Sequence, residues 1–332
     1  MPSPRVADAH SDLLIEVAFA EDRLAEANPL RDRWLGSLEQ GAVVLQTCAI
    51  YVEPEHLRDG RGLLRALRLA HAFHAGVRAN ADRAFAVTSL ADLARLDDGR
   101  RGLLLSLEGA DSLGEDPWLI DVLAALGVRM ASPTWNGANA FAAGCGAEGG
   151  LTARGRELVD RMVANHVAVD LAHAAPRTFW DALERVPPGH ALVSHAACGA
   201  VLDHPRNLGD DQLRALAEHG GVVGLMPHPL VVDEQAPTLD RFVDHVDHAV
   251  AVAGPRHVAL GGDFLRQIAR TIGLPDPEVG PVADAAIEGL DGPAQYPALA
   301  DALTRRGYGD DDVAALFGGN LLALLARTLP AG

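Results

Sequence analysis

Short apolar segments alternate with helical segments along the chain, and this alternation limits the fold more than any other feature. Eight apolar segments are predicted to form the principal strands, at residues 6–14, 42–52, 102–110, 128–135, 167–173, 191–195, 221–226 and 257–263. Residues 84–88 are predicted to form an accessory strand. Strands separated by helices pair in parallel through right-handed crossovers. Eight such strands predict an α/β fold, a (β/α)8 barrel of the TIM type, with a doubly wound open sheet as the alternative.

The length of 332 residues fits either two ordinary domains or one barrel with insertions. Helices are predicted between the strands at 29–40, 61–78, 89–96, 116–126, 151–165, 177–185, 210–218 and 239–253. Three more, at 296–306, 310–316 and 320–327, form a tail. No change of composition marks a boundary, and no internal repeat is present. We therefore predict a single catalytic domain, residues 1–332, with a C-terminal helical tail.

Polar residues able to bind a metal ion stand at or near the carboxyl ends of five of these strands. They are His10, Asp12, Glu108, His173, His195 and Asp263. In a (β/α)8 barrel these strand ends meet at one mouth, where the chemistry is placed. Singly, each residue has a structural explanation, such as a histidine bonded to the backbone, a loop carboxylate or a helix cap. All six stand at the ends of apolar segments, which is not expected by chance, and the sequence therefore predicts a metal site.

The first two candidate ligands, His10 and Asp12, stand two residues apart. If their segment is a strand, its period of two places both side chains on one face. A histidine satisfied by a neighbouring carboxylate is the alternative for this pair. Two other pairs of histidines have helical spacing and are expected on solvated helix faces. These are His71 with His74 and His245 with His248.

Three imidazoles and three carboxylates are more ligands than one four-coordinate zinc ion uses. Two Zn²⁺ or other divalent transition-metal ions would use all six. Glu108 is the expected bridge because its strand lies between the two groups in barrel order. Two ions about 3.5–4 Å apart can activate a shared hydroxide. Such a site would attack a carbonyl or phosphoryl centre without a serine or cysteine nucleophile.

Charge and cysteine content exclude several classes of protein. The net charge is −17 and no basic cluster is present, which argues against nucleic acid and anionic membranes as partners. The three cysteines, Cys48, Cys145 and Cys198, form no C-x-x-C pair, and this usage fits a reducing compartment. We see neither a signal peptide nor an apolar run of about 18–20 residues that could span a bilayer. The expected location is cytoplasmic.

Six further patterns follow one another in a fixed order. They are D-A-H-S-D at 8–12, S-L-E-G at 106–109, L-T followed by V-D-L-A-H within 151–173, V-S-H followed by H-P-R-N within 193–207, G-G-D-F at 261–264 and G-G-N at 318–320. Together they resemble the motifs of the membrane (renal) dipeptidase family of zinc metallopeptidases, which have amidohydrolase-type barrels. The resemblance extends over nearly the whole chain, from about Val6 to Arg327.

This resemblance implies a function and a division of the ligands. One zinc ion would be held by His10, Asp12 and Glu108, and the second by Glu108, His173 and His195. Asp263 would lie at the first ion and carry the proton from the attacking water to the leaving amine. Arg206 would bind the terminal carboxylate of a small dipeptide. The C-terminal residue of that dipeptide could be an L- or a D-residue. Homodimers are implied by the resemblance alone.

Two departures from the family pattern bear on specificity. Where the family usually has L-T-H, this chain has Pro133-Thr134-Trp135, and Trp135 offers only an indole N–H. Loss of an electrophilic donor costs about 10²–10³ in rate, and Asn136 or Asn139 is the expected replacement. Where the family has D-G after its last strand, this chain has Leu265-Arg266.

These departures keep two alternative functions open. The first is another amidohydrolase reaction at the same binuclear site, namely hydrolysis of an N-acyl amino acid, lactam or lactone. The second is a non-catalytic, metal-binding homologue.

Overall fold

The computed structural model describes residues 5–273 and 286–332 and contains one parallel sheet. Its strands are β1 (Val6–Asp8), β2 (Val43–Tyr51), β3 (Ala84–Ala86), β4 (Arg101–Glu108), β5 (Val128–Ala131), β6 (Ala168–Asp170), β7 (Ala191–Ala196), β8 (Val222–Leu225) and β9 (Val258–Leu260). Most are short and buried along their whole length, as expected for strands covered on both faces.

Eight of these strands close into a barrel. Their order is β2-β1-β9-β8-β7-β6-β5-β4, and β2 pairs with β4 to complete the ring. The short strand β3 pairs only with the first residues of β4, outside the ring. The predicted (β/α)8 barrel with an accessory ninth strand is therefore confirmed.

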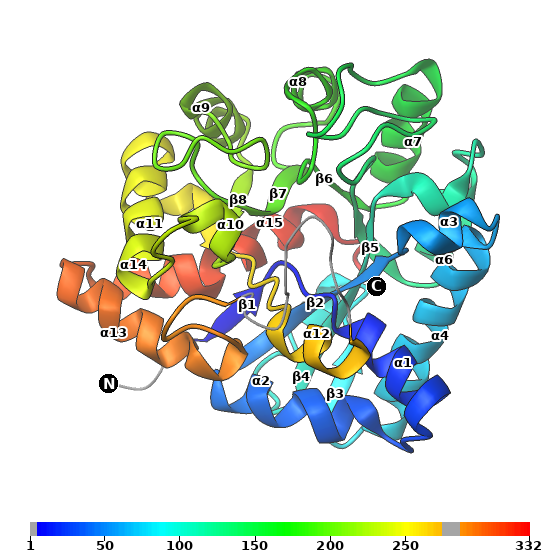
Figure 1. Cartoon of the computed structure of the whole chain (residues 1–332), viewed down its shortest axis with the longest axis horizontal. Coiled ribbons are helices and arrows are strands. Elements are labelled where there is room, and N and C mark those ends of the chain that lie inside the picture. The colour runs from blue at the N-terminus through cyan, green and yellow to red at the C-terminus, as the bar shows by residue number, and fades with distance from the viewer. Residues whose placement is uncertain (1–4, 274–285) are drawn as a thin grey trace.

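Helices surround the barrel (Figure 1). They are α1 (Leu13–Leu24), α2 (Gly36–Gln40), α3 (Pro54–Arg58), α4 (Gly62–Ala79), α5 (Leu90–Leu93), α6 (Leu119–Ala125), α7 (Ala153–Ala164), α8 (Pro176–Leu183), α9 (Asp210–Glu218), α10 (Pro229–Val232), α11 (Leu239–Ala253), α12 (Arg266–Ile272), α13 (Tyr296–Arg306), α14 (Asp310–Ala314) and α15 (Asn320–Thr328). Their start signals are local. The Thr152 and Thr238 hydroxyls accept backbone N–H groups at the starts of α7 and α11.

The first predicted strand is wrong in its extent. Strand β1 ends at Asp8, and helix α1 begins at Leu13. The apolar residues from Leu13 onward follow helical spacing and bury one face of α1. The apolar run of residues 6–14 therefore includes both a strand and the start of a helix. His10 and Asp12 therefore lie in the loop between the two elements, and the argument from a strand period does not apply to them.

The end of the barrel where the strands begin is closed by an apolar plug. Leu321, Leu324 and Leu325 of α15 pack with inward-facing residues of the strands, among them Leu104 and Leu192. Asn320 donates hydrogen bonds to the carbonyl oxygens of Pro255 and Val258, at the start of β9. Helix α15 is thus tied to the base of the barrel, opposite the strand ends that carry the candidate ligands.

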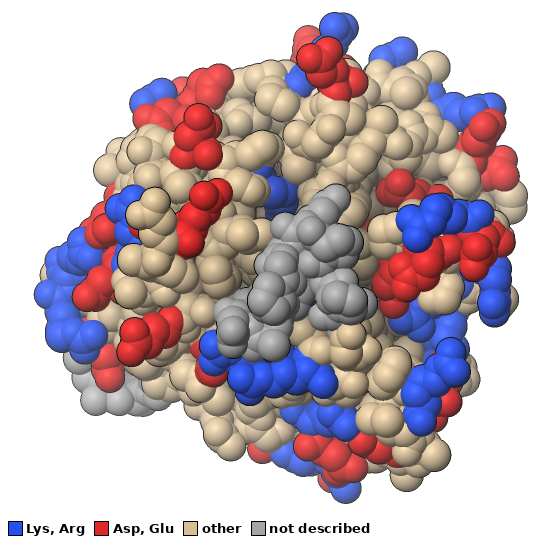
Figure 2. Space-filling model, in the orientation of Figure 1, with Lys and Arg blue, Asp and Glu red and all other residues tan. Residues whose placement is uncertain are grey.

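None of the helices in the described part of the chain has both the length and the apolarity needed to cross a bilayer. On the face shown in Figure 2, acidic and basic side chains are interspersed around the rim.

Candidate metal centre and substrate cavity

The six predicted ligands meet at the mouth of the barrel. Glu108 is the last residue of β4, and His195 lies in β7. The other four follow the ends of β1, β6 and β9 within a few residues. Five are buried and Asp263 is partly buried, and the side chains of Asp12 and Asp263 are each 12% exposed. The barrel topology brings them together, since the strand ends converge although the residues are far apart in sequence.

One half of the cluster is rich in carboxylates. His10 Nε2 lies 3.4 Å from Glu108 Oε2, 3.7 Å from Asp12 Oδ1 and 3.7 Å from Asp263 Oδ1. The backbone N–H of Asp263 donates to the carbonyl oxygen of His10 at 3.2 Å, which holds the two loops together. The ligand atoms that lie within 4.8 Å of one another form the groups His10, Asp12 and Asp263 and His10, Glu108 and His195, whereas the resemblance implies a group of His10, Asp12 and Glu108.

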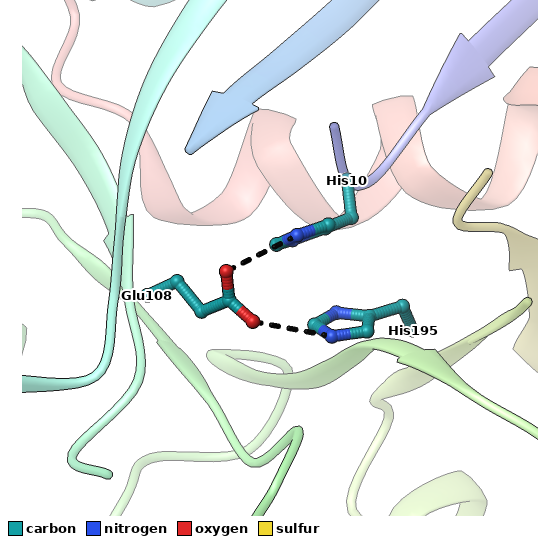
Figure 3. Close-up of side chains that lie close together, drawn as sticks. All are labelled: His10, Glu108 and His195. Atoms are coloured by element: carbon teal, nitrogen blue, oxygen red, sulfur yellow. Dashed lines mark ion pairs between the residues drawn. The ribbon is translucent and has the colours of Figure 1, made fainter. Parts of the chain in front are cut away.

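The other half is rich in imidazoles. Glu108 Oε1 lies 2.9 Å from His173 Nε2 and 3.5 Å from His195 Nε2, and these two ring nitrogens are 2.9 Å apart. Figure 3 shows how the two oxygens of Glu108 point to different imidazoles, His10 on one side and His195 on the other. The Glu108 carboxylate therefore contacts both halves.

In the half that contains His173 and His195, hydrogen bonds determine which nitrogen of each imidazole is free to bind a metal ion. Nδ1–H of His173 donates to Asn136 Oδ1 at 2.6 Å. Nδ1–H of His195 donates to the Ser194 hydroxyl at 2.8 Å, and that hydroxyl donates to Asp170 at 2.5 Å. With the proton on Nδ1, both Nε2 lone pairs point toward the Glu108 oxygen. Three lone pairs at such distances are the arrangement of a metal site.

Two buried carboxylates hold the backbone beneath the ligands. Asp8, the last residue of β1, accepts the N–H groups of His10 and Gly262 and the Tyr296 hydroxyl. Asp170, the last residue of β6, accepts the N–H groups of Ala172 and Ser194.

The backbone at two candidate ligands lies in the left-handed region. His173 has φ of 63° and Asp263 has φ of 42°. These conformations are unfavourable for residues with a side chain and persist where the surroundings impose them. A side chain at Gly262 would also place its Cβ 2.7 Å from Asp8 Oδ2, so only glycine fits there.

The electrostatics of the cluster favour a bound cation. Burial raises the pKa of Asp263 to about 6, and burial together with the charge of Glu108 raises the pKa of Asp12 well above its usual value. Burial lowers the pKa of His173 to about 3 and that of His195 well below its usual value. The carboxylates, Glu108 foremost, outweigh the effect of burial at His10 and raise its pKa well above the usual value, so a positive charge among these carboxylates is favoured, as it would be for a bound cation.

Three buried polar atoms in the cluster have no hydrogen-bond partner among the described residues. They are His10 Nε2, Asp12 Oδ1 and Glu108 Oε2. Unpaired buried polar atoms are costly, and a divalent cation between them would satisfy all three. Imidazole nitrogens and carboxylate oxygens are ligands of zinc and similar ions, so the residues present fit such a metal.

A cavity of about 490 Å³ opens beside the cluster, and Glu108 forms part of its wall. Trp135, Asn136 and Arg206, the three residues predicted to bind substrate, all line it. Arg206 donates to the carbonyl oxygen of His195 at 3.1 Å. Within the described part of the chain, no carboxylate forms an ion pair with its guanidinium. In the view of Figure 2, basic atoms lie in a hollow near the centre of the molecule.

The asparagines predicted to replace a catalytic donor differ in their surroundings. Asn139 uses both amide hydrogens and its oxygen within the loop, with Asp111, Pro133, Phe141 and Ala142. The Asn136 oxygen contacts His173 and the Cys145 thiol, while its side chain also lines the cavity. Of the two residues, Asn136 is the one beside the cluster.

Trp135 forms an aromatic wall of the cavity. Its ring centroid lies 5.3 Å from that of Tyr51 and 5.7 Å from that of His173. Gly109, with φ of 75°, lets the backbone of Trp135 approach closely, because a Cβ there would lie 3.2 Å from the Cβ and the backbone nitrogen of Trp135.

Sequence reasoning missed the supporting residues Asp8, Asp170, Ser194 and Tyr296. Asp8 and Asp170 carried one usable signal, because each is a carboxylate two or three residues before a predicted histidine ligand. The predicted solvated position of His245 is wrong. It is buried, accepts the Cys198 N–H through Nδ1 and donates to the Val232 carbonyl oxygen.

A family comparison covers almost the whole chain. Residues 3–329 match the model of the membrane dipeptidase family, peptidase family M19. An uncharacterized dipeptidase of Schizosaccharomyces pombe is 32% identical over 232 residues, which cover 68% of this chain and 53% of that protein. Dipeptidase verJ of Clonostachys rogersoniana is 30% identical over 231 residues, which cover 68% of this chain and 55% of that protein. The chain thus spans about half the length of these two curated relatives.

Solved structures share the fold. A metallopeptidase from Rhodobacter sphaeroides, bound to a phosphinate mimic of the dipeptide L-Ala-D-Ala, superposes with a TM-score of 0.85 at 23% identity and covers 98% of this chain and 99% of its own. A dipeptidase described as an M19 metallopeptidase superposes with a TM-score of 0.86 at 22% identity, covering 99% of this chain and 100% of its own.

Proposed function

This chain belongs to the membrane dipeptidase family, peptidase family M19, and we propose that it is a metal-dependent dipeptidase using two Zn²⁺ or similar divalent ions. Its substrates are small dipeptides with an L- or D-residue at the C-terminal position. The observation that carries the proposal is the position of Glu108, whose two oxygens face two different groups of ligands. A bridging carboxylate of this kind suits a binuclear centre.

The metal ions would be held by His10, Asp12 and Glu108 on one side and by Glu108, His173 and His195 on the other. When bound, they would polarise the scissile carbonyl and lower the pKa of a water molecule, so that hydroxide is available to attack the carbonyl carbon. Asp263 would accept the proton of that water and return it to the leaving amine. Asn136 and the Ser194–Asp170 pair keep the two imidazoles in the form that binds metal.

Arg206 supplies substrate recognition. A planar guanidinium can bind a carboxylate through two parallel hydrogen bonds, and this one has no acidic partner among the described residues. Since the cavity joins Arg206 to Glu108, a dipeptide whose terminal carboxylate is held at Arg206 would extend its peptide bond toward the metal ligands.

The test combines metal analysis with a substrate panel. The purified protein is expected to bind two equivalents of zinc and to hydrolyse L,L- or L,D-dipeptides. His195→Ala is expected to retain one equivalent or less. Arg206→Ala is expected to raise KM for dipeptides with a free carboxylate but not for their amides. Absence of turnover on every dipeptide would contradict the proposal.

Trp135 favours a second candidate function. Because an indole replaces the family's usual histidine, the same centre could act on an N-acyl amino acid, lactam or lactone. Turnover confined to such compounds in the same panel would establish this alternative. Full metal loading without hydrolysis of any compound would instead indicate a non-catalytic metal-binding protein.

A further inference from the structure

The cavity beside the metal ligands has two chemically different ends. Arg206 and its neighbour His204 belong to the segment that follows β7. Tyr51, Val52, Pro54 and Leu57 belong to the end of β2 and to α3. In the closed ring, β2 and β7 are separated by three strands in either direction, so they face one another across the mouth. The basic end and the apolar end of the cavity therefore lie on opposite sides of the barrel axis.

An acidic side chain lies on the apolar side. Asp111 belongs to the 3-10 helix Ala110–Leu113, which directly follows β4, the neighbour of β2. Its Oδ2 accepts the Asn139 amide at 3.0 Å, so the carboxylate is held in place. Among the described residues that line the cavity, Asp111 and Glu108 are the acidic ones. Glu108 is already engaged with the imidazoles, and Asp111 is therefore the carboxylate open to a ligand.

This charge arrangement matches a zwitterionic dipeptide, the substrate class of the proposed function, on which the inference rests. With the terminal carboxylate at Arg206 and the peptide bond at the metal ligands, the N-terminal residue must lie beyond them. An extended dipeptide spans about 7 Å, which places this residue on the side of β2 and β4. Here its ammonium group meets Asp111 and its side chain meets the apolar wall.

We propose that Asp111 binds the α-ammonium group of the substrate, and that Tyr51, Leu57 and Trp135 select a large apolar side chain on its N-terminal residue. The Tyr51 and Trp135 rings are 5.3 Å apart and tilted by 58°, and they form two sides of the pocket. Leu57 is half-buried on α3 and lines the cavity. An apolar pocket gains roughly fourfold for each methylene group it buries, whereas a charged side chain would lose its hydration here.

The side-chain preference is tested with dipeptides X-Ala in which X is Gly, Ala, Leu, Phe or Glu. The expected kcat/KM rises about 100-fold from Gly to Leu or Phe, and Glu is expected to be poor. Leu57→Ala should lower kcat/KM for X = Leu and Phe and leave X = Gly nearly unchanged. Leu64→Ala, at a surface position of α4 that is 59% exposed, is the matched control and should alter none of them.

The role of Asp111 is tested by equilibrium binding. The probes are phosphinate dipeptide mimics with and without the α-amino group, titrated into the zinc-loaded protein. The wild type is expected to bind the amino form about 10- to 100-fold more tightly, the contribution of a hydrogen bond between charged groups. Asp111→Asn should abolish this preference and leave affinity for the desamino mimic unchanged. Asp116→Asn, at an exposed position of the same segment, is the control.

The outcomes separate this inference from the proposed function. If the enzyme hydrolyses dipeptides but kcat/KM is equal for Gly, Leu and Phe, the apolar pocket is wrong while the dipeptidase function stands. If Asp111→Asn weakens both mimics equally, its role is structural and the ammonium contact is wrong. If no dipeptide is hydrolysed by the wild type, the function itself fails and this inference fails with it.

Discussion

The two ends of the barrel enclose side chains of opposite character, apolar at the base and polar at the mouth. At the base, Leu321, Leu324 and Leu325 of α15 fill the interior with side chains that carry no polar atoms. At the mouth, five buried polar side chains and the partly buried Asp263 gather around Glu108 and His10, and three of their atoms have no partner among the described residues. Most side chains at both ends are buried, and the two ends differ chiefly in whether those side chains are apolar or polar.

This difference indicates where stability and function reside. The base gains free energy from apolar burial and close packing. The mouth loses free energy, because carboxylates are desolvated beside one another and the backbone is left-handed at His173 and Asp263. We therefore expect substitutions at the mouth to reduce activity without loss of stability, and substitutions at the base to do the reverse.

The largest effect is expected for Asp263→Asn. Loss of the proton carrier should lower kcat by about 10²–10⁴, while zinc content stays near that of the wild type. In chelator, its melting temperature should be equal or higher, since one buried negative charge is removed. Steady-state kinetics, metal analysis and calorimetry on the same preparation check this. Near-normal turnover, or a large fall in melting temperature, would contradict the division between mouth and base.

Leu324→Ala tests the other end. Leu324 is fully buried in the plug, and its truncation should lower the free energy of unfolding by about 2–5 kcal/mol. The kcat/KM of the folded fraction should be unchanged. Urea unfolding measures the first quantity, and Leu64→Ala on the surface provides the control for leucine truncation itself. A loss of activity without a loss of stability would show that the two ends are coupled.

Asp170→Asn sharpens the comparison within the mouth. The substitution weakens the hydrogen bonds that orient Ser194 and, through it, His195. Zinc affinity should fall by about 10- to 100-fold, which is typical for a partner of a metal ligand. Competition with a chromophoric chelator measures it. Ser194→Ala should reproduce much of the effect. Unchanged zinc affinity in both variants would show that the hydrogen bonds from Asp170 through Ser194 to His195 do not contribute to metal binding.

The smallest effect concerns His245, which lies outside both ends. Burial, assisted by the charge of Arg241, lowers the pKa of His245 in the folded protein. The unfolded chain therefore takes up this proton first, and stability should be lost as the pH falls below about 6.5. One such group contributes at most about 1.4 kcal/mol per pH unit. His245→Gln should flatten the slope of unfolding free energy between pH 6.5 and 5, whereas His71→Gln at an exposed position should leave it unchanged.

Much of the fold and site could be predicted because both depend on local patterns. Apolar segments of strand length alternate with amphipathic helices, and this pattern is confirmed as a barrel. Glu108, His173, His195 and Asp263 could be singled out because a polar residue ending a buried strand is unusual. Their assignment as metal ligands remains a prediction, which the geometry supports.

Other features could not be predicted, because they depend on which segments meet. Asp8 bonds to Gly262 and Tyr296, more than 250 residues away. His245 has the spacing of a surface residue, but the loop after β7 and helix α10 cover it.

The sequence by itself determined the order of strands and helices and the six polar residues at the ends of apolar segments. These follow from hydrophobic periodicity, which acts over a few residues. Only the tertiary structure decided that the sheet closes into a barrel, that Glu108 presents one oxygen to each group of ligands, that His10 and Asp12 stand in a loop, and that Asp111 and Arg206 line one cavity. Distances between such atoms arise from the closure of the ring, which no short segment of the chain encodes.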